Sequence, residues 1–67
     1  MSILIGDDSM NNHVYSNTIT NSTFGVSFAG SNSKNNLVEN NQLSGVPYPV
    51  TFNGINNVGK NNSVHNR

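Results

Sequence analysis

Two stretches of the chain decide its fold: residues 11–34, NNHVYSNTITNSTFGVSFAGSNSK, and residues 35–60, NNLVENNQLSGVPYPVTFNGINNVGK. Each begins with an Asn-Asn pair, and a third pair, Asn61-Asn62, begins the sequence NNSVHNR. The three pairs lie 24 and 26 residues apart, and apolar residues recur at matching places after each pair. Self-similarity at a period of about 20 to 50 residues is typical of a solenoid or an array of repeats.

Within each repeat the pattern predicts short strands. Asn, Ser, Thr and Gly are frequent, and all four are poor residues for a helix interior. Residues 26–28 and 50–52 alternate apolar and polar side chains, as a half-buried strand does, and Val14 and Ile19 lie on two further short β-rich pieces. The pair Ser16-Asn17 lies between those pieces, and the tolerance of asparagine for left-handed backbone angles suits a sharp corner there. Three strands per repeat predict an all-β fold, a parallel β-helix of about 2.5 coils.

The alignment divides a single domain, residues 1–67, into a partial coil (1–10), two full coils (11–34 and 35–60) and a second partial coil (61–67). Equivalent residues of successive coils should stack in columns about 4.8 Å apart. The Asn17–Asn41 column is expected to form a ladder of side-chain amides. The columns expected to form the core are Ile3, Val26 and Val50; Ile5, Phe28 and Phe52; Ile19 and Leu43; Val14, Val38 and Val64; and Phe24 and Tyr48.

Composition narrows the classes of partner. The formal net charge is zero with three basic residues, which argues against binding to nucleic acid or to an anionic membrane. No apolar run approaches the roughly 20 residues of a membrane span, and there is no cysteine for a disulfide or a thiolate zinc site. A chain of 67 residues also buries little core on its own. We therefore expect it to form a homo-oligomer or to be part of a longer chain.

The pattern Asn-Asn-x-Val-x-x-Asn-x-Ile, followed by Phe-Gly-Val-Ser-Phe-x-Gly-Ser, resembles the right-handed parallel β-helix of the pectate-lyase-like superfamily. That superfamily includes polysaccharide lyases, glycosidases, alginate epimerases and phage tailspikes. The resemblance covers nearly the whole chain and rests on turn and core positions. It implies that Asn17 and Asn41 form the corner between the second and third sheets. It also implies that residues 3–5, 26–28 and 50–52 floor a substrate groove, and that the protein is extracellular or part of a virion.

Few side chains can carry chemistry, because Asp7, Asp8 and Glu39 are the only acids. Asp7-Asp8 follows the first strand, where it reads either as a Ca²⁺-binding or sugar-contacting pair or as ordinary turn residues. Glu39 shares a predicted column with Tyr15 and His65. Glu39 and His65 could then touch, either as an acid–base pair or as a solvated surface pair. No other cofactor is indicated.

Three functions follow from these expectations. The first is a non-catalytic segment of a carbohydrate-active β-helix, such as a polysaccharide lyase or an alginate epimerase, that supports or extends a saccharide groove. Its expected sugar contacts are Ser27, Thr51, Tyr48 and Asn53, through hydroxyl and amide groups and ring stacking. The second is a structural β-helix module of a phage tailspike or appendage that assembles as an oligomer. The third is a catalytic fragment that uses Asp7 or Asp8.

Overall fold

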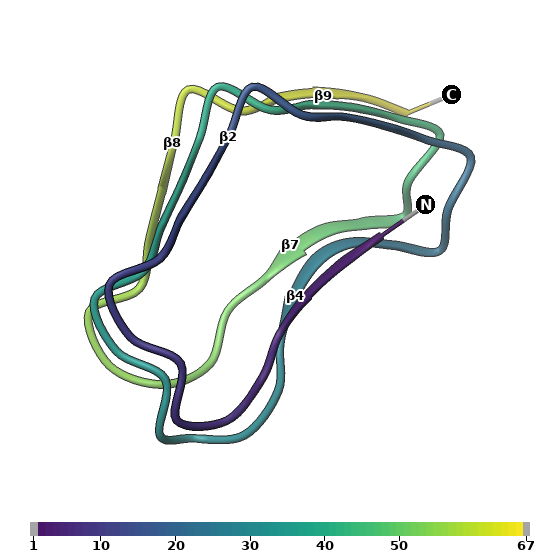
Figure 1. Ribbon diagram of the computed structural model, residues 1–67. Helices are drawn as coiled ribbons and strands as arrows, with labels where there is room; N and C mark the ends of the chain where they lie inside the picture. Colours follow the sequence, from purple (N-terminus) through teal and green to yellow (C-terminus); the bar gives the residue numbers. More distant parts are fainter. Residues whose placement is uncertain (1, 67) are drawn as a thin grey trace.

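The computed structural model describes residues 2–66 and contains only strands, turns and loops in this part of the chain (Figure 1). The strands are short, with three to five residues each. They are β1 (Ile3–Ile5), β2 (His13–Tyr15), β3 (Thr18–Thr20), β4 (Phe24–Phe28), β5 (Leu37–Glu39), β6 (Gln42–Ser44), β7 (Tyr48–Thr51), β8 (Val58–Lys60) and β9 (Ser63–His65).

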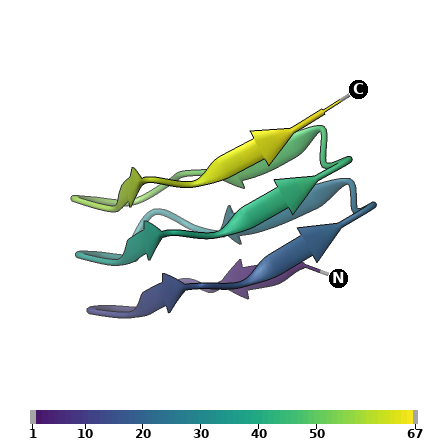
Figure 2. The ribbon, with the colours of Figure 1, turned by 90° about the horizontal axis from the view of Figure 1, so that it is seen from above.

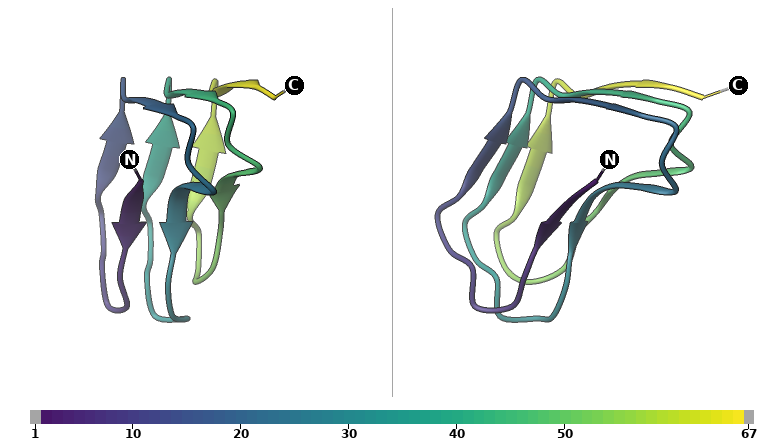
Figure 3. Two further views of the ribbon diagram at one scale, coloured as in Figure 1. Left: turned by 90° about the vertical axis from the view of Figure 1, so that its right-hand side faces the viewer. Right: turned by 45° about the vertical axis from the view of Figure 1, so that its right-hand side comes forward.

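The strands form three parallel sheets, and each sheet takes every third strand along the chain. The sheet orders are β1-β4-β7, β2-β5-β8 and β3-β6-β9, with parallel pairing throughout. We use the word layer for three consecutive strands, one from each sheet: β1–β3, β4–β6 and β7–β9. Figures 2 and 3 show the three layers stacked on one another. The predicted all-β class is confirmed, and the arrangement is compatible with a small stack of the β-helix type.

The corners between strands depend on residues that accept left-handed backbone angles. Asn11, Asn35 and Asn56 have φ between 57° and 59° and occupy the same place in successive layers. A second set, Ser16, Asn40 and Asn61, has φ between 56° and 57° at the next corner. The left-handed angle expected at Asn17 is therefore taken by the residue before it, Ser16. Asparagine is one of the few side chains that visit this region at low cost. The abundance of asparagine therefore follows in part from the number of sharp corners.

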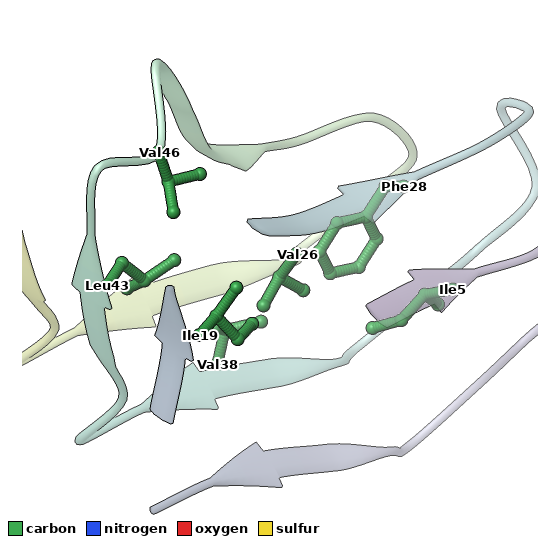
Figure 4. Packing of buried hydrophobic residues seen from close by; sticks show 7 residues of the cluster. All are labelled: Ile5, Ile19, Val26, Phe28, Val38, Leu43 and Val46. Carbon is green, nitrogen blue, oxygen red and sulfur yellow. The ribbon is translucent and has the colours of Figure 1, made fainter. Parts of the chain in front are cut away.

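The core lies between the three sheets and consists of aliphatic side chains and one phenylalanine. Figure 4 shows the cluster of Ile5, Ile19, Val26, Phe28, Val38, Leu43 and Val46. The pairing confirms the predicted columns Ile3–Val26–Val50, Ile5–Phe28, Ile19–Leu43 and Val14–Val38. Phe52, predicted as the third core member of the Ile5–Phe28 column, is 47% exposed, although its ring lies 5.2 Å from that of Phe28 between centroids. Burial of an aliphatic side chain of this size stabilises a fold by about 1.5–3 kcal/mol.

The prediction that Phe24 and Tyr48 belong to the core was wrong. The two residues pair in register, but their side chains are 46% and 54% exposed, and their rings stack outside the sheet with centroids 5.1 Å apart. Gly25 takes the inward place, because a Cβ there would lie only 2.4 Å from Leu43 Cδ2. Both Gly25 and Val26 are buried, so the strict alternation of inward and outward side chains breaks at the start of β4.

The predicted register of the third layer was also wrong. Val64 pairs with Leu43, and the place beside Val38 is taken by Gly59. Equivalent asparagines, Asn36 and Asn57, are therefore 21 residues apart, whereas the alignment set this interval at 26. Figure 1 shows the correspondingly shorter path of the chain from β7 to β8. The ring of Phe52 lies 2.8 Å from where a Cβ on Gly59 would be. This ring takes the space beside Gly59 that the side chains of Val14 and Val38 take in the other two layers.

Candidate functional site

The predicted amide ladder is present and runs through all three layers. Oδ1 of Asn41 accepts hydrogen bonds from the main-chain N–H (2.9 Å) and from Nδ2 (3.1 Å) of Asn17. In the same way, Oδ1 of Asn62 accepts from N (3.1 Å) and Nδ2 (3.0 Å) of Asn41. The Nδ2 of Asn41 also donates to the carbonyl oxygen of Val14 at 3.1 Å. Asn41 is fully buried, so its amide must find its hydrogen-bond partners within the protein, as these bonds provide.

A second ladder, which the sequence analysis missed, lies one corner earlier in each layer. Oδ1 of Asn36 accepts from the N–H of Asn12 (2.8 Å), and Oδ1 of Asn57 accepts from N and Nδ2 of Asn36 (both 3.0 Å). Asn36 is also almost completely buried, and its Nδ2 donates to the carbonyl oxygen of Ser9. The signal was available, because Asn35-Asn36 and Asn40-Asn41 are two pairs five residues apart, as are Asn56-Asn57 and Asn61-Asn62.

Both ladders have a direction. Every ladder Oδ1 that is hydrogen-bonded accepts from the layer that precedes it, as Asn41 accepts from Asn17 and Asn57 from Asn36. Within residues 2–66, Oδ1 of Asn17 and the N–H of Asn62 have no partner, and they lie at opposite ends of one ladder. A further layer would thus have to present amide oxygens on one side of the stack and N–H donors on the other.

The outer face of the β1-β4-β7 sheet holds most of the predicted sugar contacts. Ser27 and Thr51 pair in register next to Leu4, whose side chain is 69% exposed. Ser27 Oγ is shielded from solvent and has no hydrogen-bond partner among the described residues. Tyr48 lies on the same sheet, in the exposed stack with Phe24. The sheet therefore brings together Ser27, Thr51 and Tyr48.

Asn53, the fourth predicted contact, lies two residues beyond Thr51 in the loop that follows β7. Its side chain is exposed, and its Oδ1 accepts a hydrogen bond of 2.9 Å from the main-chain N–H of Gly54. Gly54 has φ 85°, a left-handed conformation, and a Cβ there would lie 2.2 Å from the carbonyl oxygen of Ser33. The loop thus requires glycine at this position.

Asp7 and Asp8 lie in the turn after β1, as predicted. Oδ1 of Asp7 accepts a hydrogen bond of 2.9 Å from the N–H of Asn32, which ties this turn to the equivalent loop of the next layer. Asp8 lines an open pocket of about 280 Å³ together with Met10, Asn32 and Lys34. Residues 2–66 contain no group of three or more His, Asp or Glu side chains that could hold a metal ion. A Ca²⁺ ion takes six to eight oxygen ligands, so main-chain carbonyls and water would have to supply most of them here.

The predicted contact between Glu39 and His65 was wrong, because the register shift places His65 beside Ser44 on another sheet. Glu39 instead meets His13, with Oε1 2.7 Å from Nε2. The ring of Tyr15 lies 4.3 Å from that of His13 between centroids. The three side chains form a surface group on the β2-β5-β8 sheet, and exposed pairs of this kind contribute about 0–1 kcal/mol to stability.

None of the elements in residues 2–66 is a helix long and apolar enough to cross a membrane. Comparison of the chain with protein-family models, with curated proteins and with solved structures gave no match.

Proposed function

We propose that the chain is a segment of a right-handed parallel β-helix of the pectate-lyase-like type, and that it extends a saccharide-binding surface without catalysing a reaction. The observation that supports the proposal is the outer face of the β1-β4-β7 sheet. There the exposed, stacked rings of Phe24 and Tyr48 lie on the same strands as Thr51, which is partly exposed, whereas its register partner has a hydroxyl shielded from solvent. Sugars offer apolar C–H faces and hydroxyl groups, and aromatic rings and polar side chains complement both.

The proposed role is binding because this face carries no pair of acids. Glycosidases act through two carboxyl groups about 5 to 9.5 Å apart. The outward residues of the sheet are Leu4, Phe24, Ser27, Tyr48 and Thr51, none of which is acidic. Asp7 remains the nearest acid along the chain, and its carboxylate already accepts the hydrogen bond from Asn32. Stacking and hydrogen bonds to neutral groups are therefore the interactions that the face offers.

The replacement Tyr48→Ala tests the proposal. We expect it to weaken binding to a panel of immobilised acidic and neutral polysaccharides about tenfold, because an aromatic stacking surface is lost. Tyr15→Ala is the matched control, since Tyr15 is 56% exposed, has one ring contact and lies on a different sheet. Surface plasmon resonance measures the affinity of both variants for each polysaccharide. Absence of saccharide binding by the unmodified chain, or an equal loss in both variants, would contradict the proposal.

A second candidate, a structural module of an elongated tailspike or appendage, is favoured by the direction of the two ladders. Such a module needs layers that stack in one orientation only, and ladders that all accept from the preceding layer supply that orientation. Sedimentation of the same samples distinguishes the two candidates. Stable oligomers that bind none of the polysaccharides would favour the structural module.

A further inference from the structure

One asparagine differs from the others in its chemical surroundings. The chain contains fifteen asparagines, and Asn53 is the one that a glycine follows. Asn53 and Gly54 are both exposed in the loop between β7 and β8. The hydrogen bond from Gly54 N to Asn53 Oδ1 holds the side-chain carbonyl next to the main-chain nitrogen of the following residue. In the loss of a side-chain amide from asparagine, that main-chain nitrogen is the atom that attacks the side-chain carbon Cγ.

In the ladder asparagines, both the side-chain amide and the main-chain nitrogen that follows it are hydrogen-bonded to other groups. The nitrogens that follow Asn36 and Asn41 are those of Leu37 and Gln42, and they donate to main-chain oxygens of the preceding layer at 2.9 and 2.8 Å. The amide groups of Asn36 and Asn41 are themselves bonded through both oxygen and nitrogen. For either residue to react, the local stack would first have to open.

We propose that Asn53 is a site of spontaneous, intramolecular deamidation. The nitrogen of Gly54 loses its proton and forms a bond to Cγ of Asn53, while the bond from Cγ to Nδ2 breaks and the amide nitrogen leaves as ammonia. The five-membered succinimide that results takes up one water molecule at either of its two carbonyl carbons and opens to aspartate or isoaspartate. No oxidant or reductant takes part. Gly54 favours the step because it has no Cβ to hinder the approach of its nitrogen.

The modification acts on the third layer of the stack. Either product places a carboxylate in a loop that is neutral in the unmodified chain. Isoaspartate also adds one carbon to the main chain at a point where the carbonyl oxygen of Asn53 accepts a hydrogen bond from Nδ2 of Asn57. Gly54 lies against Ser33 at the same point. The last member of one amide ladder is therefore displaced. The inference rests on this loop alone and does not depend on the proposed function.

Peptide mapping by mass spectrometry tests the inference on the 67-residue chain, held folded in a mildly alkaline buffer. Deamidation adds about 1 Da, and we expect it at Asn53 at least about tenfold faster than at Asn62, because the ladder must open before Asn62 reacts. Asn62 is the matched internal control, since a small residue, Ser63, follows it and its amide is bonded in a ladder. The replacement Asn53→Ala should abolish the fast phase of deamidation. We expect the fold to accept alanine there, because Ala29 occupies the equivalent position in the preceding layer.

A parallel sample unfolded in urea separates the chemistry from the fold. There we expect Asn62 to deamidate faster than in the folded chain, while Asn53 still reacts. The inference would be overturned if Asn53 kept its amide for as long as Asn62 does in the folded chain. It would also be overturned if the fast phase persisted in Asn53→Ala.

Discussion

Replacement of Asn41 by alanine should lower the free energy of unfolding by about 3 kcal/mol, because it removes a fully buried amide whose oxygen and nitrogen both bond to part-buried main-chain groups. The N–H of Asn17 loses the oxygen that accepts its hydrogen bond, and the carbonyl oxygen of Val14 loses its side-chain donor. Each unsatisfied buried group costs about 1–3 kcal/mol. Equilibrium unfolding in urea, followed by circular dichroism, measures the change.

Gln42→Ala is the control for this prediction. Gln42 is the next residue, lies on β6 and is exposed, and its side chain makes no hydrogen bond within the described part of the chain. We expect its replacement to change the free energy of unfolding by less than about 0.5 kcal/mol. Equal effects of the two replacements would mean that the buried amide of Asn41 is not a main source of stability.

Leu43→Ala has the second large expected effect, a loss of about 2–5 kcal/mol in the free energy of unfolding. Leu43 is fully buried in the column between Ile19 and Val64. Its Cδ2 methyl fills the space above Gly25, so truncation leaves a cavity lined by Ile19 and the main chain of β4. The carbonyl oxygen of Pro49 lies 2.3 Å from where a Cβ on Gly25 would be, and it prevents a larger residue at position 25 from filling the cavity.

Thermal unfolding followed by circular dichroism measures the effect of Leu43→Ala against Leu4→Ala. Leu4 carries the same side chain on the outer face of a sheet, 69% exposed. We expect a clear decrease in melting temperature for Leu43→Ala and little change for Leu4→Ala. If both variants melted at the temperature of the unmodified chain, the core described for this fold would be incorrect.

The fold could be predicted where the sequence repeat and the alternation of apolar and polar residues within a strand indicate the same alignment. From Ile3 to Thr51 the columns predicted at a spacing of 23 or 24 residues recur as strand pairs, with Ser27 beside Thr51 and Val14 beside Val38. These columns combine an apolar pattern of period two with an unambiguous alignment of the segments. Phe24 and Tyr48 also pair in register, but their side chains point outward, because Gly25 takes the inward place.

The third layer was predicted in the wrong register because two alignments match asparagine pairs to asparagine pairs. An Asn-Asn pair begins at each of residues 35, 40, 56 and 61, so a shift of five residues matches asparagine to asparagine. The wrong choice aligned Val64 with Val38 and hid the place of Gly59. A glycine in a core column argued against the correct register, and only the structure shows that the ring of Phe52 occupies the space.

The five-residue misalignment of the third layer also explains which predictions about the candidate sites were correct. The ladder of Asn17 and Asn41 was predicted correctly, since both residues lie in the first two layers, which the misalignment does not affect. The contact of Glu39 with His65 depended on the misaligned third layer, and His13 takes that place. The saccharide contacts at Ser27, Thr51, Tyr48 and Asn53, and the roles of Asp7 and Asp8, remain predictions.

Through-space NMR contacts between methyl groups test the register of the third layer, in which Asn57 and Asn62 continue the two asparagine ladders. Val64 is the decisive probe, because the register of the structure places it beside Leu43 and the alternative register places it beside Val38. We predict a strong methyl–methyl cross peak between Val64 and Leu43. A strong cross peak between Val64 and Val38, with none to Leu43, would contradict the account.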